Sequence, residues 1–160
     1  MKRVMASVVV LLLVGAAIAG AQEQSGTQIV EIELGFVGGY RLAQPELVGG
    51  QSFGLNLAVG PNFMAGVQAV SVTGPGGTDA YGMFGLSYLF GQSLGLSVLA
   101  GGTGGGSVSG GLMMFFNLFQ NQDSNTFTSA LKLKAGYLFN VAAGIADGSI
   151  VLGVASAFGM

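Results

Sequence analysis

Large apolar residues alternate with small or polar residues along most of the chain after residue 28. In the segment Ser93–Gly101, for example, Leu94, Leu96 and Val98 are each followed by a glycine, serine or leucine. A period of two is the signal of a β-strand, because successive side chains of a strand point to opposite faces of the sheet. The pattern therefore predicts an all-β protein.

The alternation predicts eight strands of about 9–13 residues, close to the length that a tilted strand needs to cross a membrane. They are Gln28–Tyr40, Ser52–Gly60, Phe63–Thr73, Ala80–Phe90, Ser93–Gly101, Ser107–Leu118, Phe127–Phe139 and Gly148–Phe158. An even number of strands returns the chain to the side from which it started. Loops are expected on the far side at 41–51, 74–79, 102–106 and 140–147. On the near side, the connection 119–126 is longer than the short turn expected there.

The second face of the predicted strands carries Gly, Ala, Ser, Asn and Met instead of charged residues. An antiparallel sheet in water has one apolar face and one charged face, and neither face here suits water. A closed barrel in lipid explains both faces, because large apolar side chains would contact acyl chains while small ones fill a narrow lumen. The sequence therefore predicts an eight-stranded antiparallel up-and-down transmembrane β-barrel.

Four charged residues fall inside the predicted strands: Glu31, Glu33, Lys132 and Lys134. All four lie on the face opposite the large apolar residues. The first and seventh strands run in the same direction, so we expect these residues to form a charge cluster in the lumen, since a lone buried charge is costly. Such a cluster either plugs the barrel and maintains the strand register, or acts as a gate or ion-selective element. The same face predicts five uncharged polar residues in the lumen: Asn56, Gln68, Ser87, Ser97 and Asn117.

Glycine is the most distinctive component of the chain, with 30 residues. Many of these glycines fall on the predicted inner face, which allows two interpretations. The lumen could be unusually open and pass or hold a small uncharged solute. Alternatively, glycine relieves strain where a small barrel coils tightly, and Met64, Met83, Met113 and Phe115 fill the space that glycine leaves.

The N-terminus has the three parts of a secretory signal peptide. Met1–Arg3 is basic, Val4–Ala19 is apolar, and Ala19-Gly20-Ala21 is a run of small residues that suits cleavage. We expect residues 1–21 to be a helical signal peptide read by the Sec pathway and residues 22–160 to form the barrel. The alternative is a retained membrane anchor. The sequence contains no cysteine, so it does not encode a lipoprotein.

Composition and charge exclude several functions. Charged residues make up 8% of the chain, against about 25% in an average soluble domain. There is no Cys, His or Trp, and the net charge is −2 without a basic run, which argues against cysteine or histidine metal sites, His-assisted catalysis and nucleic-acid binding. We therefore expect no enzyme activity, no cofactor and no metal.

The signal peptide, the eight alternating segments and a C-terminal strand Ser149–Phe158 together resemble the small eight-stranded outer-membrane barrels of the OmpA/OmpX type. The resemblance implies a location in the outer membrane of a diderm bacterium. It also implies contact with the barrel-insertion machinery, which reads a C-terminal aromatic residue. Here Gly159 and Met160 follow Phe158, which departs from that pattern. Within this class the structural and narrow-channel roles suit the chain best, and the oligomeric state stays open. The alternatives are a surface adhesin and a secreted, self-assembling glycine-rich β-protein with cross-β stacking.

Overall fold

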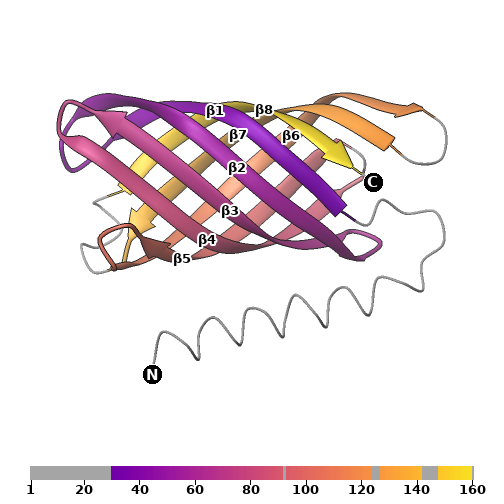
Figure 1. Cartoon of the computed structure of the whole chain (residues 1–160), viewed down its shortest axis with the longest axis horizontal. Helices are drawn as coiled ribbons and strands as arrows, with labels where there is room; N and C mark the ends of the chain where they lie inside the picture. Colours follow the sequence, from indigo (N-terminus) through magenta and orange to yellow (C-terminus); the bar gives the residue numbers. More distant parts are fainter. Residues whose placement is uncertain (1–29, 92, 124–126, 142–147, 160) are drawn as a thin grey trace.

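The computed structural model describes residues 30–91, 93–123, 127–141 and 148–159, and the rest of the chain is drawn in grey in Figure 1. The described residues form eight β-strands. In chain order they are β1 (Val30–Arg41), β2 (Glu46–Gly60), β3 (Phe63–Gly74), β4 (Gly77–Phe90), β5 (Leu94–Thr103), β6 (Val108–Asp123), β7 (Phe127–Asn140) and β8 (Gly148–Gly159).

The strands form one closed barrel in which each strand pairs with the next and β8 returns to pair with β1 (Figure 1). Every pairing is antiparallel. The predicted all-β, eight-stranded up-and-down barrel is confirmed. Within the described part of the chain, no helix is long and apolar enough to cross a membrane.

The register of the ladder determines how steeply the strands tilt. A path through paired residues that starts at Glu31 returns to β1 at Arg41, ten residues further along the strand. The path runs through Asn56, Gly66, Gly85, Leu99, Gly111, Leu138 and Ser149. A stagger of this kind requires strands tilted by about 35–45° from the axis, and eight such strands enclose an interior just wide enough for side chains to fill.

Strand β2 begins earlier than the alternation indicated. It starts at Glu46, so the predicted loop 41–51 shrinks to residues 42–45. Leu47 points outward with 79% of its surface exposed, whereas Val48 is buried inside. The glycine pair Gly49-Gly50 hides this alternation in the sequence, because neither residue has a side chain to show which face it occupies.

The long connection expected at 119–126 is also wrong. Strand β6 continues to Asp123 and β7 starts at Phe127, so only residues 124–126 separate them. The β6–β7 register shifts between Asn117 and Phe119. A bulge adds one residue to one strand of a pair and reverses the facing of the residues that follow, which interrupts a pattern with a period of two. The predicted signal peptide (1–21), most of the 140–147 loop and Met160 lie outside the described residues.

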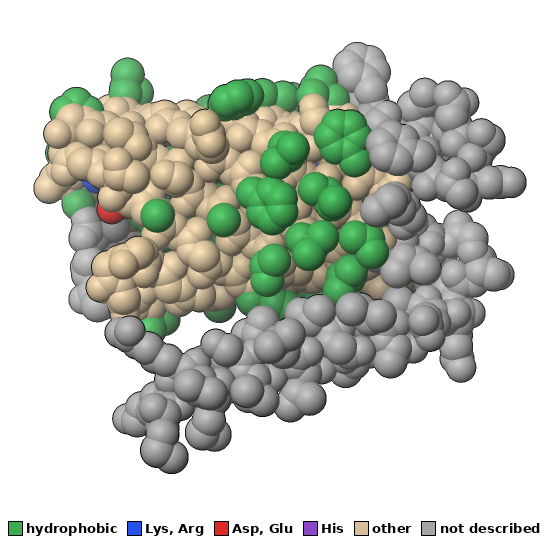
Figure 2. Space-filling model, viewed as in Figure 1, with side chains coloured by type: hydrophobic (Ala, Val, Ile, Leu, Met, Phe, Trp, Pro, Cys, Tyr) green, Lys and Arg blue, Asp and Glu red, His purple; other side chains and the backbone are tan. Residues whose placement is uncertain are grey.

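Large apolar side chains cover much of the outer surface. Phe36, for example, is 70% exposed. On the face shown in Figure 2, hydrophobic side chains (green) gather over the end of the barrel near the C-terminus. The opposite half of this face shows mostly backbone and side chains that are neither hydrophobic nor charged (tan). Outward positions in that half hold small or polar residues, including Gly49, Ser71, Ala80 and Gly82.

The interior is divided into three zones along the axis, and β1 contributes to each of them. Buried Glu31 and Glu33 lie near its start, buried Val37 lies in the middle, and buried Arg41 lies at its end. We call these zones the charged layer, the apolar plug and the mouth. The apolar plug comprises ten buried residues: Val37, Val48, Val70, Val72, Tyr81, Met83, Leu99, Met113, Leu138 and Val151.

Candidate functional site

The charged layer is built from two strands that are not neighbours. Glu31 and Glu33 lie on β1, and Lys132 and Lys134 lie on β7, with β8 between them. The β8 residues that pair with this region and point inward are small, Ala155 opposite Lys132 and Ala157 opposite Glu33. Because these alanines occupy little volume, the lysine side chains can extend across β8 and reach the carboxylates of β1.

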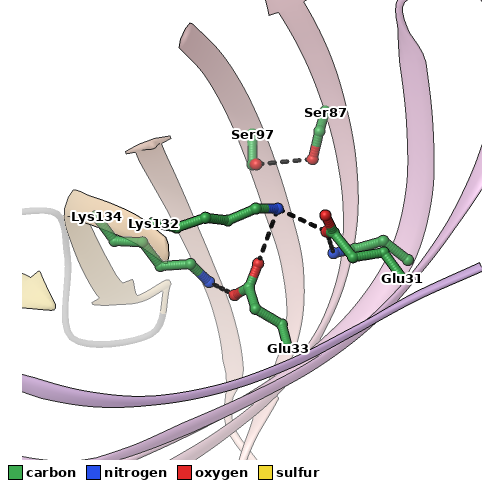
Figure 3. A network of polar contacts seen from close by, with 7 residues as sticks. Glu31, Glu33, Ser87, Ser97, Lys132 and Lys134 are labelled. Carbon is green, nitrogen blue, oxygen red and sulfur yellow. Dashed lines mark hydrogen bonds and ion pairs between the residues drawn. The ribbon is translucent and has the colours of Figure 1, made fainter. Parts of the chain in front are cut away.

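Lys132 is the centre of the charged layer (Figure 3). Its Nζ donates to Oε1 of Glu31 at 2.6 Å and to Oε2 of Glu33 at 3.3 Å. The other carboxylate oxygen of Glu33 forms an ion pair with Lys134. Asn56 also donates through Nδ2 to Oε1 of Glu31, at 3.0 Å. The two cations and two anions are therefore paired within one network.

Burial makes this pairing necessary. Lys132 is only 2% exposed, and the other three charged side chains are also buried. Removing an ion from water costs several kcal/mol, and the attraction between partners offsets that cost only with good geometry and further hydrogen bonds. With a balanced set of charges and the Asn56 amide, the layer meets both conditions.

An aromatic ring gives further support to the central lysine. The Nζ of Lys132 lies 4.8 Å from the centroid of the Phe115 ring, a distance at which a cation is attracted to the negative face of the ring. The ring in turn lies over Gly95, where an added Cβ would overlap its atoms, with Cε1 and Cε2 both at 2.6 Å. Glycine at position 95 thus creates the space that Phe115 occupies.

The uncharged polar residues expected in the lumen differ in their contacts and in how close they lie to the charged layer. Ser87 and Ser97 are buried and hydrogen-bonded to each other, with their oxygens 2.7 Å apart. Asn117 lies opposite Lys132 in the β6–β7 ladder. Gln68 is buried and pairs with Gly54 and Met83 along the ladder, and no hydrogen bond among the described residues connects it to the charged layer.

The glycines of the inner face do not leave an open axis. An added Cβ at Gly85 would lie 2.7 Å from a methyl carbon of Leu99, and one at Gly111 would lie 2.7 Å from a methyl carbon of Leu138. Both leucines belong to the apolar plug and are almost completely buried. The first of the two interpretations, an open lumen, therefore differs from the structure, because large side chains from neighbouring strands fill the volume beside glycines such as Gly85 and Gly111. The filling role expected for Met83, Met113 and Phe115 agrees with their burial, whereas Met64 is only half-buried.

A second set of charges, which was not predicted from the sequence, lies at the mouth. Arg41 forms an ion pair with Glu46 and a second with Asp79, whose Oδ2 lies 2.8 Å from Nη2. Glu46 also accepts a hydrogen bond from the backbone N–H of Gly76 at 2.8 Å. The parity of the first strand could have indicated that Arg41 points inward like Glu31. Its partners could not be identified, because Glu46 and Asp79 were assigned to loops.

Among the residues that the structure describes, no group of three or more Asp, Glu, His or Cys could hold a metal ion. The carboxylates of the charged layer are occupied by lysines. The contacts of the charged layer are therefore made among its own cations and anions.

Comparisons with known proteins found similarity among solved structures only. No protein-family model matches the chain, and no curated protein matches it. A solved structure described as "De novo design of transmembrane beta-barrels" is similar, with 16% sequence identity, a TM-score of 0.46, and coverage of 84% of this chain and 98% of that chain. What this protein does must therefore be inferred from its own residues.

Proposed function

We propose that this chain is a small integral outer-membrane β-barrel protein with a closed lumen and a structural role. The observation that carries the proposal is an inverted distribution of side chains. Large apolar residues such as Phe36, Leu47 and Leu152 are exposed on the outside, whereas the lysines and glutamates of the charged layer are buried inside.

A lipid bilayer is the solvent that suits this distribution. Monomeric proteins in water rarely expose large contiguous apolar patches, and the outer strand faces of this barrel do so over much of their length. Hydrocarbon also requires that every backbone polar group be paired within the protein. The ladder that closes between β1 and β8 meets that requirement for the described strands.

The charged layer is proposed to plug the barrel and maintain the strand register. Its lysines join β7 to β1 across β8, so a slip of one residue would turn either charged pair toward the outer face. A gate or an ion-selective element would need charged groups that are free to meet an ion, whereas each lysine here is held by a glutamate.

The alternative roles have less support. A channel is opposed by the apolar plug, whose ten side chains are buried in the middle of the barrel. An adhesin is expected to carry long loops, whereas the described connections at the mouth include 42–45, 75–76 and 104–107. A secreted fibre would need free strand edges for stacking, and the closed ladder offers none among the described strands.

The route to the membrane follows from the same proposal. Residues 1–21 would direct export through the Sec pathway and be removed. The barrel-insertion machinery would then assemble residues 22–160 in the outer membrane of a diderm bacterium. The end of the barrel where β1 starts and β8 ends, near Glu31 and Gly159, would face the periplasm. The connections at that end, 61–62, 91–93 and 124–126, are short.

Two measurements on one preparation test the proposal. Protein extracted from outer membranes should migrate faster on gels when unboiled than when boiled, because a closed barrel is compact. In planar bilayers the refolded protein should produce no conductance steps. Recovery in the soluble fraction would contradict the membrane location, and reproducible ion conductance would contradict the closed lumen while leaving the location intact.

The double variant Lys132→Gln and Lys134→Gln tests the charged layer by itself. Loss of thermal stability without any gain of conductance supports a plug that maintains register. New conductance at unchanged stability indicates a gate, and no change in either property would remove any role for the cluster.

A further inference from the structure

The mouth contains a cavity that the proposed structural role does not use. Its volume is about 470 Å³, within the range of about 300–1,000 Å³ that is common for small-molecule sites. Polar side chains from several strands converge on it, among them Arg41, Asp79, Thr103, Ser107, Asn140 and Ser149. The charged layer lies at the other end of the interior, and the apolar plug separates the two.

The electrostatics of the cavity favour an uncharged ligand. Arg41, whose side chain is only 9% exposed, is already neutralised by Glu46 and Asp79. One guanidinium with two carboxylates leaves a net charge of −1, which disfavours an anion. A cation would compete with the buried guanidinium for Asp79. The cavity therefore favours neither an anionic nor a cationic ligand.

Hydrogen-bonding capacity nevertheless remains in the wall of the cavity. Asp79 lines the cavity, and 44% of its side chain is accessible. The hydroxyl groups of Thr103 and Ser107 line the cavity and can each donate and accept; Thr103 Oγ1 already accepts one hydrogen bond, from the backbone N–H of Ser107 at 3.2 Å. A ligand that offers both donors and acceptors over most of its surface, without charge, matches this wall.

We propose that the mouth of the barrel binds a neutral polyhydroxylated ligand of one or two sugar rings. The ligand enters from the end of the barrel where β1 terminates and stops at the apolar plug, so it is held and not conducted. The same chemistry is presented by a free sugar and by the sugar headgroup of a membrane glycolipid.

Backbone amide chemical shifts of the ¹⁵N-labelled full chain, refolded in lauryldimethylamine oxide micelles that contain no sugar, provide the test. Titration with D-glucose and with maltose should shift the amides of Gly104 and Gly105 at the mouth and leave that of Gly91, at the opposite end, unchanged. Glucose 6-phosphate and glucosamine should bind more weakly than glucose. The proposal would be overturned if neither glucose, maltose nor a glucose-bearing membrane lipid, monoglucosyl diacylglycerol, shifted these amides. It would also be overturned if glucose 6-phosphate or glucosamine bound more tightly than glucose.

A second arm distinguishes the two sources of the sugar. The protein is placed in phospholipid nanodiscs with and without monoglucosyl diacylglycerol. Shifts at Gly104 and Gly105 with the glycolipid, but not with free glucose, assign the site to a headgroup. Shifts with free sugar alone assign it to a soluble ligand. Either result supports a neutral-sugar site.

A matched pair of variants locates the binding. Ser107→Tyr places a ring in the cavity and should weaken sugar binding by about tenfold or more, equivalent to about 1.4 kcal/mol. Ser156→Tyr makes the same change on the outer face of β8 and should leave the affinity unchanged. Equal affinity in both variants would show that the sugar binds elsewhere and would overturn the proposal. The faster gel migration of both unboiled variants checks that each barrel has formed, and this control is independent of ligand binding.

Discussion

The charged layer and the mouth are built on the same plan but have different surroundings. In each, one cation joins two carboxylates: Lys132 joins Glu31 and Glu33, and Arg41 joins Glu46 and Asp79. The charged layer adds a second cation, Lys134, which balances the charge. Among the described residues of the mouth no second cation is present, and one carboxylate remains 44% exposed.

The difference shows how burial determines charge balance. In the dry interior an unpaired charge is strongly unfavourable, so the charged layer is neutral and completely paired. At the mouth, water solvates the excess negative charge, and a cavity can persist beside it. The first arrangement suits a permanent internal cross-link between strands, and the second suits a site that exchanges its contents with the solvent.

The largest expected effect is the removal of the central lysine. Lys132→Met should destabilise the barrel by about 3–5 kcal/mol, because it leaves two buried glutamates with one cation between them. Urea unfolding in lipid vesicles, followed by far-ultraviolet circular dichroism, measures the change. Leu133→Met, the adjacent residue on the outer face, is the control and should cost less than about 1.5 kcal/mol. Similar losses in the two variants would mean that the charged layer is not a dominant internal contact.

An intermediate effect is expected from filling the space below Phe115. Gly95→Ala places a methyl group against the Phe115 ring that supports Lys132, and overpacking of this kind costs about 1–3 kcal/mol. Unfolding in urea measures the loss, and adding Phe115→Leu to the same chain should recover part of it.

The matched control for that experiment is Gly82→Ala, since nothing lies within 4 Å of a Cβ at position 82. Its stability should stay close to that of the unsubstituted protein. If Gly95→Ala were equally harmless, the close packing of the charged layer against Phe115 would be contradicted.

The smallest effect is expected at the mouth. Asp79→Asn removes one half-exposed charge and should change stability by no more than about 1 kcal/mol, the usual range for exposed ion pairs. Because exposed pairs are screened by salt, the difference between this variant and the unsubstituted protein should shrink further in high salt. A loss as large as that of Lys132→Met would erase the distinction between the two sets of charges.

Much of the barrel could be predicted from the alternation of apolar and small residues. Where the strand prediction was wrong, the cause is local. A side chain at every second position reports which face a strand presents, and this placed Glu31 and Lys132 on the inner face. The signal vanished at Gly49-Gly50, where neither residue has a side chain, and at the register shift after Asn117, where the facing reverses. The predicted strands were therefore correct in number, and two of their ends, the start of β2 and the end of β6, were wrong by more than three residues.

The contacts within the charged layer and the lumen were harder to predict from the sequence. Lys132 and Glu31 are separated by 101 residues, and shared parity placed them on one surface without stating which pairs would meet. The open lumen, one of the two interpretations of the inner glycines, came from counting glycines one strand at a time. Whether the space beside a glycine is empty depends on neighbouring strands, here on Leu99, Leu138 and Phe115.

The sequence by itself determined the even number of strands and, outside Gly49-Gly50 and the register shift after Asn117, the facing of their residues, because both follow from which residues are adjacent along the chain. Only the tertiary structure decided the ten-residue stagger of the ladder, the crossing of lysines over the alanines of β8, and the division of the interior into charged layer, plug and mouth. These depend on volumes and distances between segments far apart in the chain, and a period of two carries no information about either.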